Sequence, residues 1–460
     1  MTTTPRICVI GAGPSGITAA KNCIAVGLDT IVYERGEKVG GNWVYSETSG
    51  HSSVYETTHI ISSKALSQYE DYPMPADYPD YPSHRLLQRY FEDYARDFGV
   101  FPHIRFGHSV EHAAPIEGGW RVRVRDSRGE EHEEQFSHLL VANGHHHDPQ
   151  MPDIPGTFNG RYFHSHDFKR VDDLYRGKRI LVIGAGNSAC DIAVETARVA
   201  AQTCISVRSG QWFVPKFMFG TPTDVFAARL SWLPPRVGQW LAAQTLRLVQ
   251  GRNRAYGLPD PTTPLYTQHP TANSELLYFI RHGEIHPRPG ITRFDGDYVD
   301  FSDGRREQFD IVIAATGYWT TFPFFDEQLI SFKHSTRIPL FKKMLHADYP
   351  DLYFIGLFQP IGCIWPMADF QARLAVAEIT GAYQRPANIR AAIQHEIDHP
   401  HYAFTPSVRH ATEVNYQRFR RELLAELSKS RVQGSGVRGR SAPCRSSNWT
   451  TPVSLAIAES

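Results

Sequence analysis

The sequence predicts an α/β fold built from two parallel-sheet units. Two glycine-rich runs support this prediction, Gly-Ala-Gly-Pro-Ser-Gly at 11–16 and Gly-Ala-Gly-Asn-Ser-Ala at 184–189. Each run follows a short apolar stretch, at 7–10 or 180–183, and opens a segment of helical character. A glycine-rich turn that leads from a strand into a helix is the fingerprint of a dinucleotide site. We therefore predict two Rossmann-like dinucleotide-binding domains, arranged as in glutathione reductase.

In such a turn each position has a physical task. The first glycine permits the tight turn, the second lets the backbone approach a pyrophosphate, and the third position packs the helix on the strand. The phosphates then accept hydrogen bonds from the unpaired N–H groups at the helix N-terminus. The residues expected around the two nucleotides are Gly11, Gly13, Pro14, Ser15 and Gly16, and then Gly184, Gly186, Asn187, Ser188, Ala189 and Asp191.

The charge that follows each fingerprint separates the two sites. Glu34 lies 23 residues after Gly11, and Arg208 lies 24 residues after Gly184. A carboxylate accepts hydrogen bonds from a ribose diol and repels a 2′-phosphate, whereas a guanidinium pairs with that phosphate. The first site therefore suits FAD or NAD and the second suits NADPH, with Ser209 as a further phosphate donor. An arginine that is merely solvated, or that stacks on the adenine of NADH, is the alternative.

Composition shifts along the chain predict where the domains divide. Residues 148–160 are rich in Pro and Gly and resemble a linker. We expect the strand and helix within 351–380 to return to the first unit. The predicted FAD-binding domain is thus discontinuous, 1–160 with 320–427, and the NADPH-binding domain is 161–319. The segment 428–460 is rich in Ser, Gly and Arg and is predicted to be disordered.

Charge and cysteine usage exclude several classes. Lys+Arg and Asp+Glu balance at 48 each, which argues against a nucleic-acid partner. The six cysteines form no C-x-x-C, and the consecutive histidines at 145–147 are typical of a polar turn, so no metal site is expected. No apolar run is long enough to span a bilayer, and the N-terminus leaves no room for a signal peptide. We expect a cytoplasmic protein with a small-molecule substrate and no membrane partner, and leave a homodimer open.

A spaced motif lies between the two fingerprints, Phe158-x-Gly160-x-x-x-His164-x-x-x-Phe168. Other runs occur in a consistent order: Gly-Gly-Asn-Trp at 40–43, Ala-Thr-Gly-Tyr at 315–318, Gly-Leu-Phe-Gln-Pro at 356–360 and Gln-Ala-Arg at 371–373. With these motifs the sequence resembles the flavin-containing monooxygenases over about residues 5–425. Baeyer–Villiger monooxygenases usually end the spaced motif in Trp, where this chain has Phe168.

The resemblance implies the chemistry and further site residues. In this family NADPH reduces FAD, and the co-substrate O2 then forms a C4a-(hydro)peroxyflavin that transfers one oxygen to a soft N or S atom of a small molecule. The protein positions the cofactors and excludes competing reactions. The resemblance adds Gly41, Asn42, Trp43 and Gln371 to the expected FAD contacts, and Ser62, Ser63 and Lys64 to the residues near the chemistry.

One departure from the family pattern keeps alternatives open. Ile61 stands where the family usually has an Asn, and it offers no hydrogen bond. Ser62 or Ser63 can substitute, or the oxygenated flavin is shorter-lived, or the same flavin performs Baeyer–Villiger oxidation of ketones. A non-catalytic nucleotide-sensing protein is the alternative from another class. Substrate-pocket candidates are Tyr69, Tyr72, Tyr78, Tyr81 and the run 211–215, for which plain packing is the competing interpretation.

Overall fold

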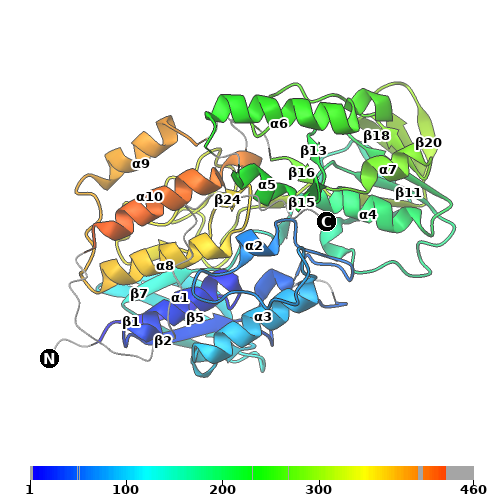
Figure 1. The fold of residues 1–460 in the computed structure, drawn as a ribbon. Helices are drawn as coiled ribbons and strands as arrows, with labels where there is room; N and C mark the ends of the chain where they lie inside the picture. The colour runs from blue at the N-terminus through cyan, green and yellow to red at the C-terminus, as the bar shows by residue number, and fades with distance from the viewer. Residues whose placement is uncertain are drawn as a thin grey trace.

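Two five-stranded parallel sheets, side by side, organise the molecule (Figure 1). The computed structural model describes residues 4–430, except 49, 51, 230, 231, 268 and 402–407. The tail predicted to be disordered was 428–460. Ser428 is the last residue of the final helix, residues 429–430 follow it directly, and 431–460 lie outside the described residues. The predicted α/β class is confirmed.

The first sheet has the strand order β23-β7-β1-β2-β3. Its two faces take alternate residues of β1: Ile7 and Val9 pack under helices, whereas Cys8 and Ile10 pack on an antiparallel sheet of three strands. Burial on both faces explains why the strand is a continuous apolar run. The elements are β1 (Arg6–Ile10), β2 (Asp29–Glu34), β3 (Ile104–Phe106), β7 (His138–Val141), β23 (Leu352–Phe354), helices α1 (Pro14–Ala25), α3 (His84–Asp97) and α8 (Trp365–Ile379), and the antiparallel strands β4 (Ser109–Ile116), β5 (Gly119–Arg125) and β6 (Glu131–Phe136).

The second sheet repeats this plan with the order β10-β21-β11-β12-β17. Ile180 and Val182 of β11 face α4, and Leu181 faces a four-stranded sheet on the other side. The elements are β10 (Arg161–His164), β11 (Arg179–Ile183), β12 (Gln202–Ser206), β17 (Ile285–Arg288), β21 (Ile311–Ala314), helices α4 (Asn187–Ala197) and α7 (Leu276–Arg281), and the covering strands β9 (Gly156–Phe158), β18 (Ile291–Gly296), β19 (Tyr298–Phe301) and β20 (Arg306–Gln308).

The chain leaves the first sheet and later returns to it. β23 pairs in parallel with β7, so residues beyond 350 complete the sheet that β1 begins. α8 then packs on α1, where the buried carboxylate of Asp369 accepts hydrogen bonds from Thr18 (2.5 Å) and Lys21 (2.9 Å). The two connections pair with each other as short antiparallel strands, β8 (Asp148–Pro149) and β22 (Tyr318–Trp319).

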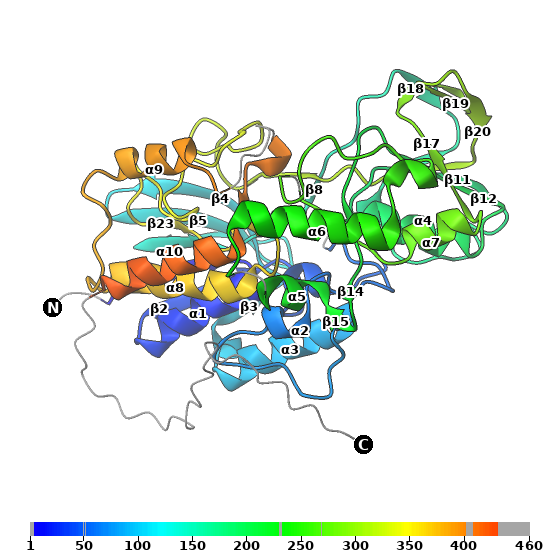
Figure 2. The same cartoon turned by 45° about the horizontal axis from the view of Figure 1, so that its top comes forward.

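A long excursion separates β12 from β17. It carries α5 (Thr223–Arg229) and α6 (Pro235–Gln250), and α6 lies across the outside of the molecule with α5 beside it (Figure 2). The excursion contacts the first unit, because the Asp224 carboxylate accepts a hydrogen bond from the Ser63 N–H at 2.6 Å. Its remaining short strands are β13 (Phe213–Val214), β14 (Phe217–Met218), β15 (Thr221–Pro222) and β16 (Thr271–Ala272).

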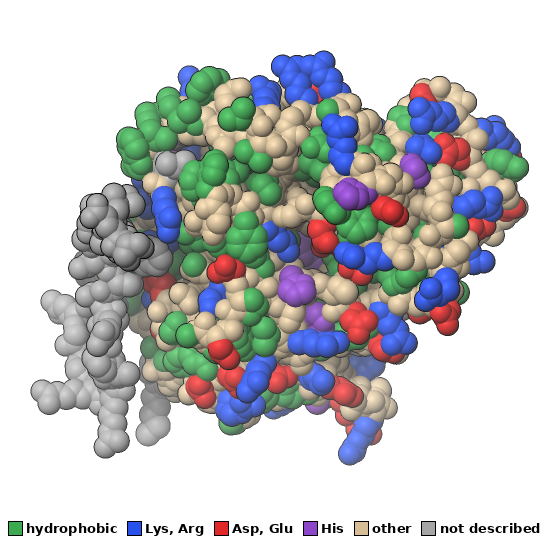
Figure 3. Space-filling view, turned by 45° about the vertical axis from the view of Figure 1, so that its right-hand side comes forward, with side chains coloured by type: hydrophobic (Ala, Val, Ile, Leu, Met, Phe, Trp, Pro, Cys, Tyr) green, Lys and Arg blue, Asp and Glu red, His purple; other side chains and the backbone are tan. Residues whose placement is uncertain are grey.

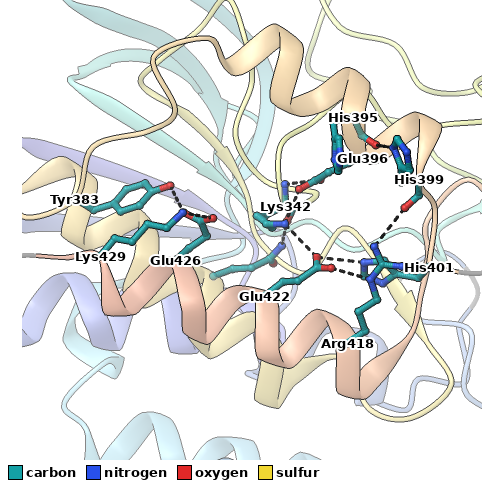
Figure 4. A network of polar contacts seen from close by, with 11 residues as sticks. Lys342, Tyr383, His395, Glu396, His399, His401, Arg418, Glu422, Glu426 and Lys429 are labelled. Atoms are coloured by element: carbon teal, nitrogen blue, oxygen red, sulfur yellow. Dashed lines mark hydrogen bonds and ion pairs between the residues drawn. The ribbon is translucent and has the colours of Figure 1, made fainter. Parts of the chain in front are cut away.

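The C-terminal helices close the first unit around a buried cation. α9 (Ile389–Asp398) supplies Glu396 and α10 (Tyr416–Ser428) supplies Glu422. Both carboxylates pair with the Lys342 ammonium, at 2.6 Å and 3.0 Å (Figure 4). The strands β24 (Gln359–Pro360) and β25 (Glu413–Val414) pair nearby, and α2 (Lys64–Ser67) is a single turn. None of the described helices is both long enough and apolar enough to cross a bilayer.

Candidate active site between the two sheets

A single cavity of about 1780 Å³ joins the two glycine-rich turns. It opens at the carboxyl ends of the parallel strands, which is where ligands bind in open α/β sheets. Both turns contribute to its wall, with Gly11, Gly13, Pro14 and Ser15 from the first, and Gly184, Gly186, Asn187 and Ser188 from the second. The geometry therefore brings both predicted nucleotide sites into one continuous space.

The first turn has the conformation that the fingerprint predicts. Gly11 has a φ of +101°, and a Cβ there would lie 2.7 Å from the carbonyl oxygen of Ala142, the residue after β7. Gly16 does not line the cavity; a Cβ at this position would lie 1.8 Å from the Gly11 carbonyl oxygen. Gly16 thus allows α1 to pack on the turn, and the first two residues of α1, Pro14 and Ser15, line the cavity.

Glu34 ends β2 at the cavity wall and is oriented by the backbone. Its Oε2 accepts a hydrogen bond from the Ala12 N–H and its Oε1 accepts one from the Gly36 N–H, both at 2.7 Å. The carboxylate is therefore fixed beside the first turn, with lone pairs left for a hydroxyl donor.

The Gly-Gly-Asn-Trp run lies against the same turn. A Cβ at Gly41 would meet the Cα of Gly13 at 2.8 Å, so the two loops touch through glycine. Asn42 Oδ1 accepts a hydrogen bond from the Ser53 N–H at 2.8 Å, and the Trp43 ring packs edge-on against Trp365. Gly41, Asn42 and Trp43 all line the cavity.

The second turn mirrors the first. Gly184 has a φ of +129°, and a Cβ there would lie 2.4 Å from the carbonyl oxygen of Ala315. Ala189 is fully buried at the third fingerprint position and packs α4 on the turn instead of lining the cavity. A Cβ at Gly186, in contrast, would meet no protein atom within 4 Å. Contacts within the protein therefore do not require a glycine at 186.

Asp191, one turn into α4, also reaches the cavity wall. Its Oδ2 accepts a hydrogen bond from the Tyr55 hydroxyl at 2.6 Å, and its Oδ1 accepts one from the Asn273 amide at 2.7 Å. Burial raises the pKa of Asp191, and these two donors partly offset that effect by stabilising the carboxylate.

Arg208 and Ser209 follow β12 at the far side of the second turn, and both line the cavity. The Arg208 side chain is exposed and lies beside Gly290, where a Cβ would meet it at 3.4 Å. Within the part of the chain that the structure describes, Arg208 has no carboxylate partner. Its guanidinium is thus available to an anionic ligand.

Comparisons with known proteins decide the family. A family model described as "Flavin-binding monooxygenase-like" matches residues 4–431. The chain belongs to this family. It is 34% identical over 439 residues to flavin-containing monooxygenase 5 of Homo sapiens, covering 90% of this chain and 81% of that protein. It is also 34% identical over 450 residues to dimethylaniline monooxygenase [N-oxide-forming] 2 of Rattus norvegicus, covering 92% and 82%.

Solved structures share the fold of this flavin-binding monooxygenase. S-allyl-L-cysteine S-oxygenase from Allium sativum superposes with a TM-score of 0.69 at 21% identity, over 93% of this chain and 89% of that one. Cyclohexanone monooxygenase from Rhodococcus sp. Phi1 bound to NADP+ gives 0.69 at 16% identity, over 93% and 98%. The predicted family and monooxygenase class are confirmed, and so is the use of a flavin, which counts against the non-catalytic alternative.

Two predicted site residues of the monooxygenase lie away from the cavity wall. The Lys64 ammonium donates to the Ala76 carbonyl at 3.0 Å and holds a neighbouring loop. Gln371 is fully buried, accepts from the Gly356 N–H at 2.8 Å and donates to the Lys342 carbonyl at 2.9 Å. The expectation of direct contact is therefore corrected for both, since each side chain is satisfied by backbone partners.

Ser62 and Ser63, which precede Lys64, have different positions: one lies at the cavity wall and the other behind it. Ser62 lines the cavity, and its hydroxyl shares a 2.8 Å hydrogen bond with the Ser67 hydroxyl. Ser63 lies behind the wall, with its N–H donated to Asp224. Ile61 faces the cavity beside Ser62. The tyrosine candidates for a substrate pocket pack in the core instead, with Tyr69 stacked on Tyr94; of the run 211–215 only Gln211 reaches the wall.

Sequence reasoning assigned the histidines at 145–147 to a polar turn and missed that this bend lines the cavity. Desolvation lowers the pKa of His147 to about 4, and it lowers that of His146 well below its ordinary value. His146 and His164 both pack against the Tyr318 ring, at 5.4 and 5.1 Å between centroids. The sequence did contain a signal for this placement, because the histidines follow a buried strand closely. Ligands bind at the edge of a parallel sheet where the strands end.

Proposed function

We propose that the first turn holds FAD, the second holds NADPH, and the monooxygenase transfers one oxygen atom from O2 to a soft nitrogen or sulfur atom of a small molecule. In this proposal residues 1–160 with 320–427 form the FAD-binding domain, and 161–319 form the NADPH-binding domain. The pairing of β9 (Gly156–Phe158) with β18 moves the first boundary back to the residues before 156. The return of β23 to the first sheet supports that division.

One observation carries the assignment of both turns to nucleotides. A Cβ at Gly186 would enter open space, and one at Gly13 would meet only the Gly41 backbone, at 3.5 Å. Both glycines have extended backbones, with φ of −79° and −71°, that any residue can adopt. Neither strain nor crowding by the protein explains them, whereas the close approach of a pyrophosphate does.

The residues around the turns fit the two groups. Glu34, oriented by two N–H donors, suits a ribose diol and rejects a 2′-phosphate. Arg208, exposed at the wall, suits that phosphate. FAD supplies the redox chemistry and the activation of dioxygen when bound. The chain binds and orients both groups, and Trp43, Trp365 and Ile61 give the cavity apolar wall that limits water near the reacting atoms.

Matched glycine variants test the two assignments separately. G13A should fold but lose the yellow colour of bound flavin, whereas G186A should stay yellow and bind NADPH at least about tenfold more weakly, about 1.4 kcal/mol. G238A, within α6, serves as a control that should change neither property. If G186A binds NADPH as tightly as the unchanged protein, the second assignment fails.

Product analysis distinguishes heteroatom oxidation from ketone oxidation. Ile61 at the cavity wall is the observation that keeps Baeyer–Villiger chemistry open, since it offers no amide to an oxygenated flavin. A thioether and a cyclic ketone are supplied in parallel under O2, and the products are identified by mass. Sulfoxide formation with little ester supports the proposal, and an ester as the dominant product would reverse the choice.

A further inference from the structure

Glu413 differs from the other shielded carboxylates of the cavity wall in its contacts. Glu34 and Asp191 also line the cavity, and each of them accepts two hydrogen bonds of 2.6–2.7 Å. Only 3% of the Glu413 side chain is exposed, and its Oε2 lies 3.4 Å from the Nδ1 of His269. Glu413 is therefore a buried acid that the chain itself satisfies poorly.

The contact between Glu413 and His269 is too long to balance a buried charge. Charge-assisted hydrogen bonds to carboxylates measure about 2.7–2.9 Å. Among the residues that the structure describes, no Lys or Arg pairs with Glu413, and no donor meets its Oε1. On the face drawn in Figure 3, in contrast, the Asp and Glu side chains mostly lie beside Lys or Arg side chains. Because a buried carboxylate without a cation is costly, a ligand is the partner that Glu413 lacks.

Residues of the first unit surround Glu413 on one side. Glu413 lies in β25 and stands opposite Gln359 of β24 in the pairing register. The Gln359 Oε1 and the His145 Nε2 are 3.3 Å apart, which makes this ring nitrogen the donor. Desolvation lowers the pKa of His145, so the ring is neutral at neutral pH and adds no positive charge that would satisfy Glu413.

The second unit closes the other side of the same space. His269 belongs to this unit, and Thr271, two residues later, donates to the Ala185 carbonyl in the second glycine turn at 2.6 Å. The space around Glu413 thus lies at the boundary between the units, where the reacting part of a substrate has to enter under the proposed function. We call it the Glu413 pocket and define it by four residues that line the cavity, His145, His269, Gln359 and Glu413.

We propose, on the basis of the proposed function above, that Glu413 binds a protonated amino group of the substrate and thereby determines specificity. The favoured substrates are soft sulfur or nitrogen compounds that carry an ammonium group apart from the atom that is oxidised. An ammonium has three donors and no acceptor, so it complements a carboxylate whose oxygens lack donors. A protonated amino group also has no lone pair for an oxidant, which directs oxygen transfer to the other, soft atom.

Charge favours an ammonium over three other ligands. A phosphate or a carboxylate would be repelled by Glu413 at close range. A neutral hydroxyl group donates one hydrogen bond and leaves the buried charge unbalanced. A metal ion is disfavoured, because the described part of the chain contains no group of three or more His, Cys, Asp or Glu side chains that could hold one.

Ligand binding to the flavin-loaded protein, without NADPH, tests the proposal apart from turnover. The probes are methylthiopropylamine, which is protonated at neutral pH because alkyl amines have pKa values of about 10, and the uncharged methylthiopropanol of similar size. We expect calorimetric titration to give a Kd for the amine that is at least about tenfold lower than that for the alcohol. E413Q should raise the Kd for the amine by about tenfold or more and leave that for the alcohol unchanged.

Turnover separates this inference from the proposed function. With NADPH and O2 present, E413Q should lower kcat/KM for sulfoxide formation from the amine by about tenfold or more, with little change for the alcohol. Glu327 is exposed and lies outside the cavity wall, so E327Q should treat both probes like the unchanged protein. If neither thioether is oxidised, the proposed function fails, whereas a lower Kd for the amine that depends on Glu413 still supports the pocket.

Three results would overturn the role of Glu413. The first is an equal Kd for amine and alcohol in the unchanged protein, a comparison that needs no variant. The second is an amine Kd that E413Q leaves as it was. The third is an equal loss for both probes, or a matching loss of NADPH affinity, which would make Glu413 a structural or cofactor-binding residue. Flavin content and circular dichroism establish that E413Q is folded.

Discussion

The hydroxyl of Tyr55 and the carboxylate of Asp191 form a 2.6 Å hydrogen bond between the two sheet units. Tyr55 lies in the loop that precedes α2 in the first unit. Asp191 lies in α4, the helix that follows the second glycine turn. The same segment is tied to the second unit by the Glu56 N–H, which donates to the Lys169 carbonyl at 2.8 Å. Together these bonds fix how the second turn faces the first.

Y55F removes this bond and leaves a buried carboxylate with one fewer donor. We expect the free energy of unfolding to fall by about 1–3 kcal/mol at neutral pH. We also expect a weaker affinity for NADPH with unchanged flavin content. Urea unfolding and fluorescence titration measure the two effects. The buried Tyr162 hydroxyl has no hydrogen-bond partner among the residues that the structure describes, so Y162F is the matched control and should cost little. Equal losses in both variants would count against a specific role of the bond.

R208Q should shift the nucleotide preference of the enzyme. Loss of a charge-assisted hydrogen bond to the 2′-phosphate costs about 1.5–3 kcal/mol, which is about a ten- to hundredfold higher Kd for NADPH. The Kd for NADH should barely change, because NADH lacks that phosphate. Parallel titrations with both nucleotides check this expectation. R198Q, at another exposed arginine of the second unit, is the control. An equal loss for NADH would indicate that Arg208 stacks on the adenine instead.

I61N restores the amide that the family usually has at this point of the cavity wall. One added hydrogen bond is worth about 0.5–1.5 kcal/mol, so the share of consumed NADPH that ends as hydrogen peroxide should fall by about two- to tenfold. Peroxide and NADPH are assayed together with a thioether present. I61L keeps the volume without the amide and should behave like the unchanged enzyme. A peroxide yield that stays the same in I61N would show that Ser62 or another group already supplies the bond.

The buried cation Lys342 predicts a characteristic response to acid. Burial raises the pKa of Glu422, but the hydrogen bond from His401 and the charge of Lys342 outweigh it, so the pKa lies well below its ordinary value of 4.5. Glu422 therefore stabilises the fold above about pH 4.5, and this contribution is lost as the pH falls further. Thermal unfolding across this range should show the decline.

K342M should be destabilised by about 1–3 kcal/mol at neutral pH, because two partly buried carboxylates lose their shared cation. Glu422 keeps its contacts with Arg418 and His401, which limits the loss. The decline of K342M below pH 4.5 should also be flatter than that of the unchanged protein.

Lys429, just after α10, is exposed, and its partner Glu426 also accepts a hydrogen bond from the Tyr383 hydroxyl, so K429M should lose less than about 1 kcal/mol. Figure 4 shows both pairs in one view. A K342M variant as stable as K429M would exclude a structural role for the buried pair.

Local patterns predicted the two glycine turns because strand, turn and helix are consecutive in the sequence. The contacts of Lys64 and Gln371 depend on partners at 76 and 356, and no local pattern specifies which way such side chains point. The histidines at 145–147 were assigned to a polar turn because three consecutive polar residues resemble one, and nothing local shows that the turn faces a cavity.

The antiparallel pairing of β8 with β22 places the entry and exit of the second unit beside each other, with Pro149 opposite Tyr318. A unit attached in this way can be removed or exchanged without stretching the rest of the chain. A short turn joining 149 to 318 should therefore yield a minimal flavoprotein that keeps its sheet intact. The same geometry makes the β8–β22 pair a suitable junction for exchanging the second unit. The replacement would be the corresponding unit of a relative with a different coenzyme requirement.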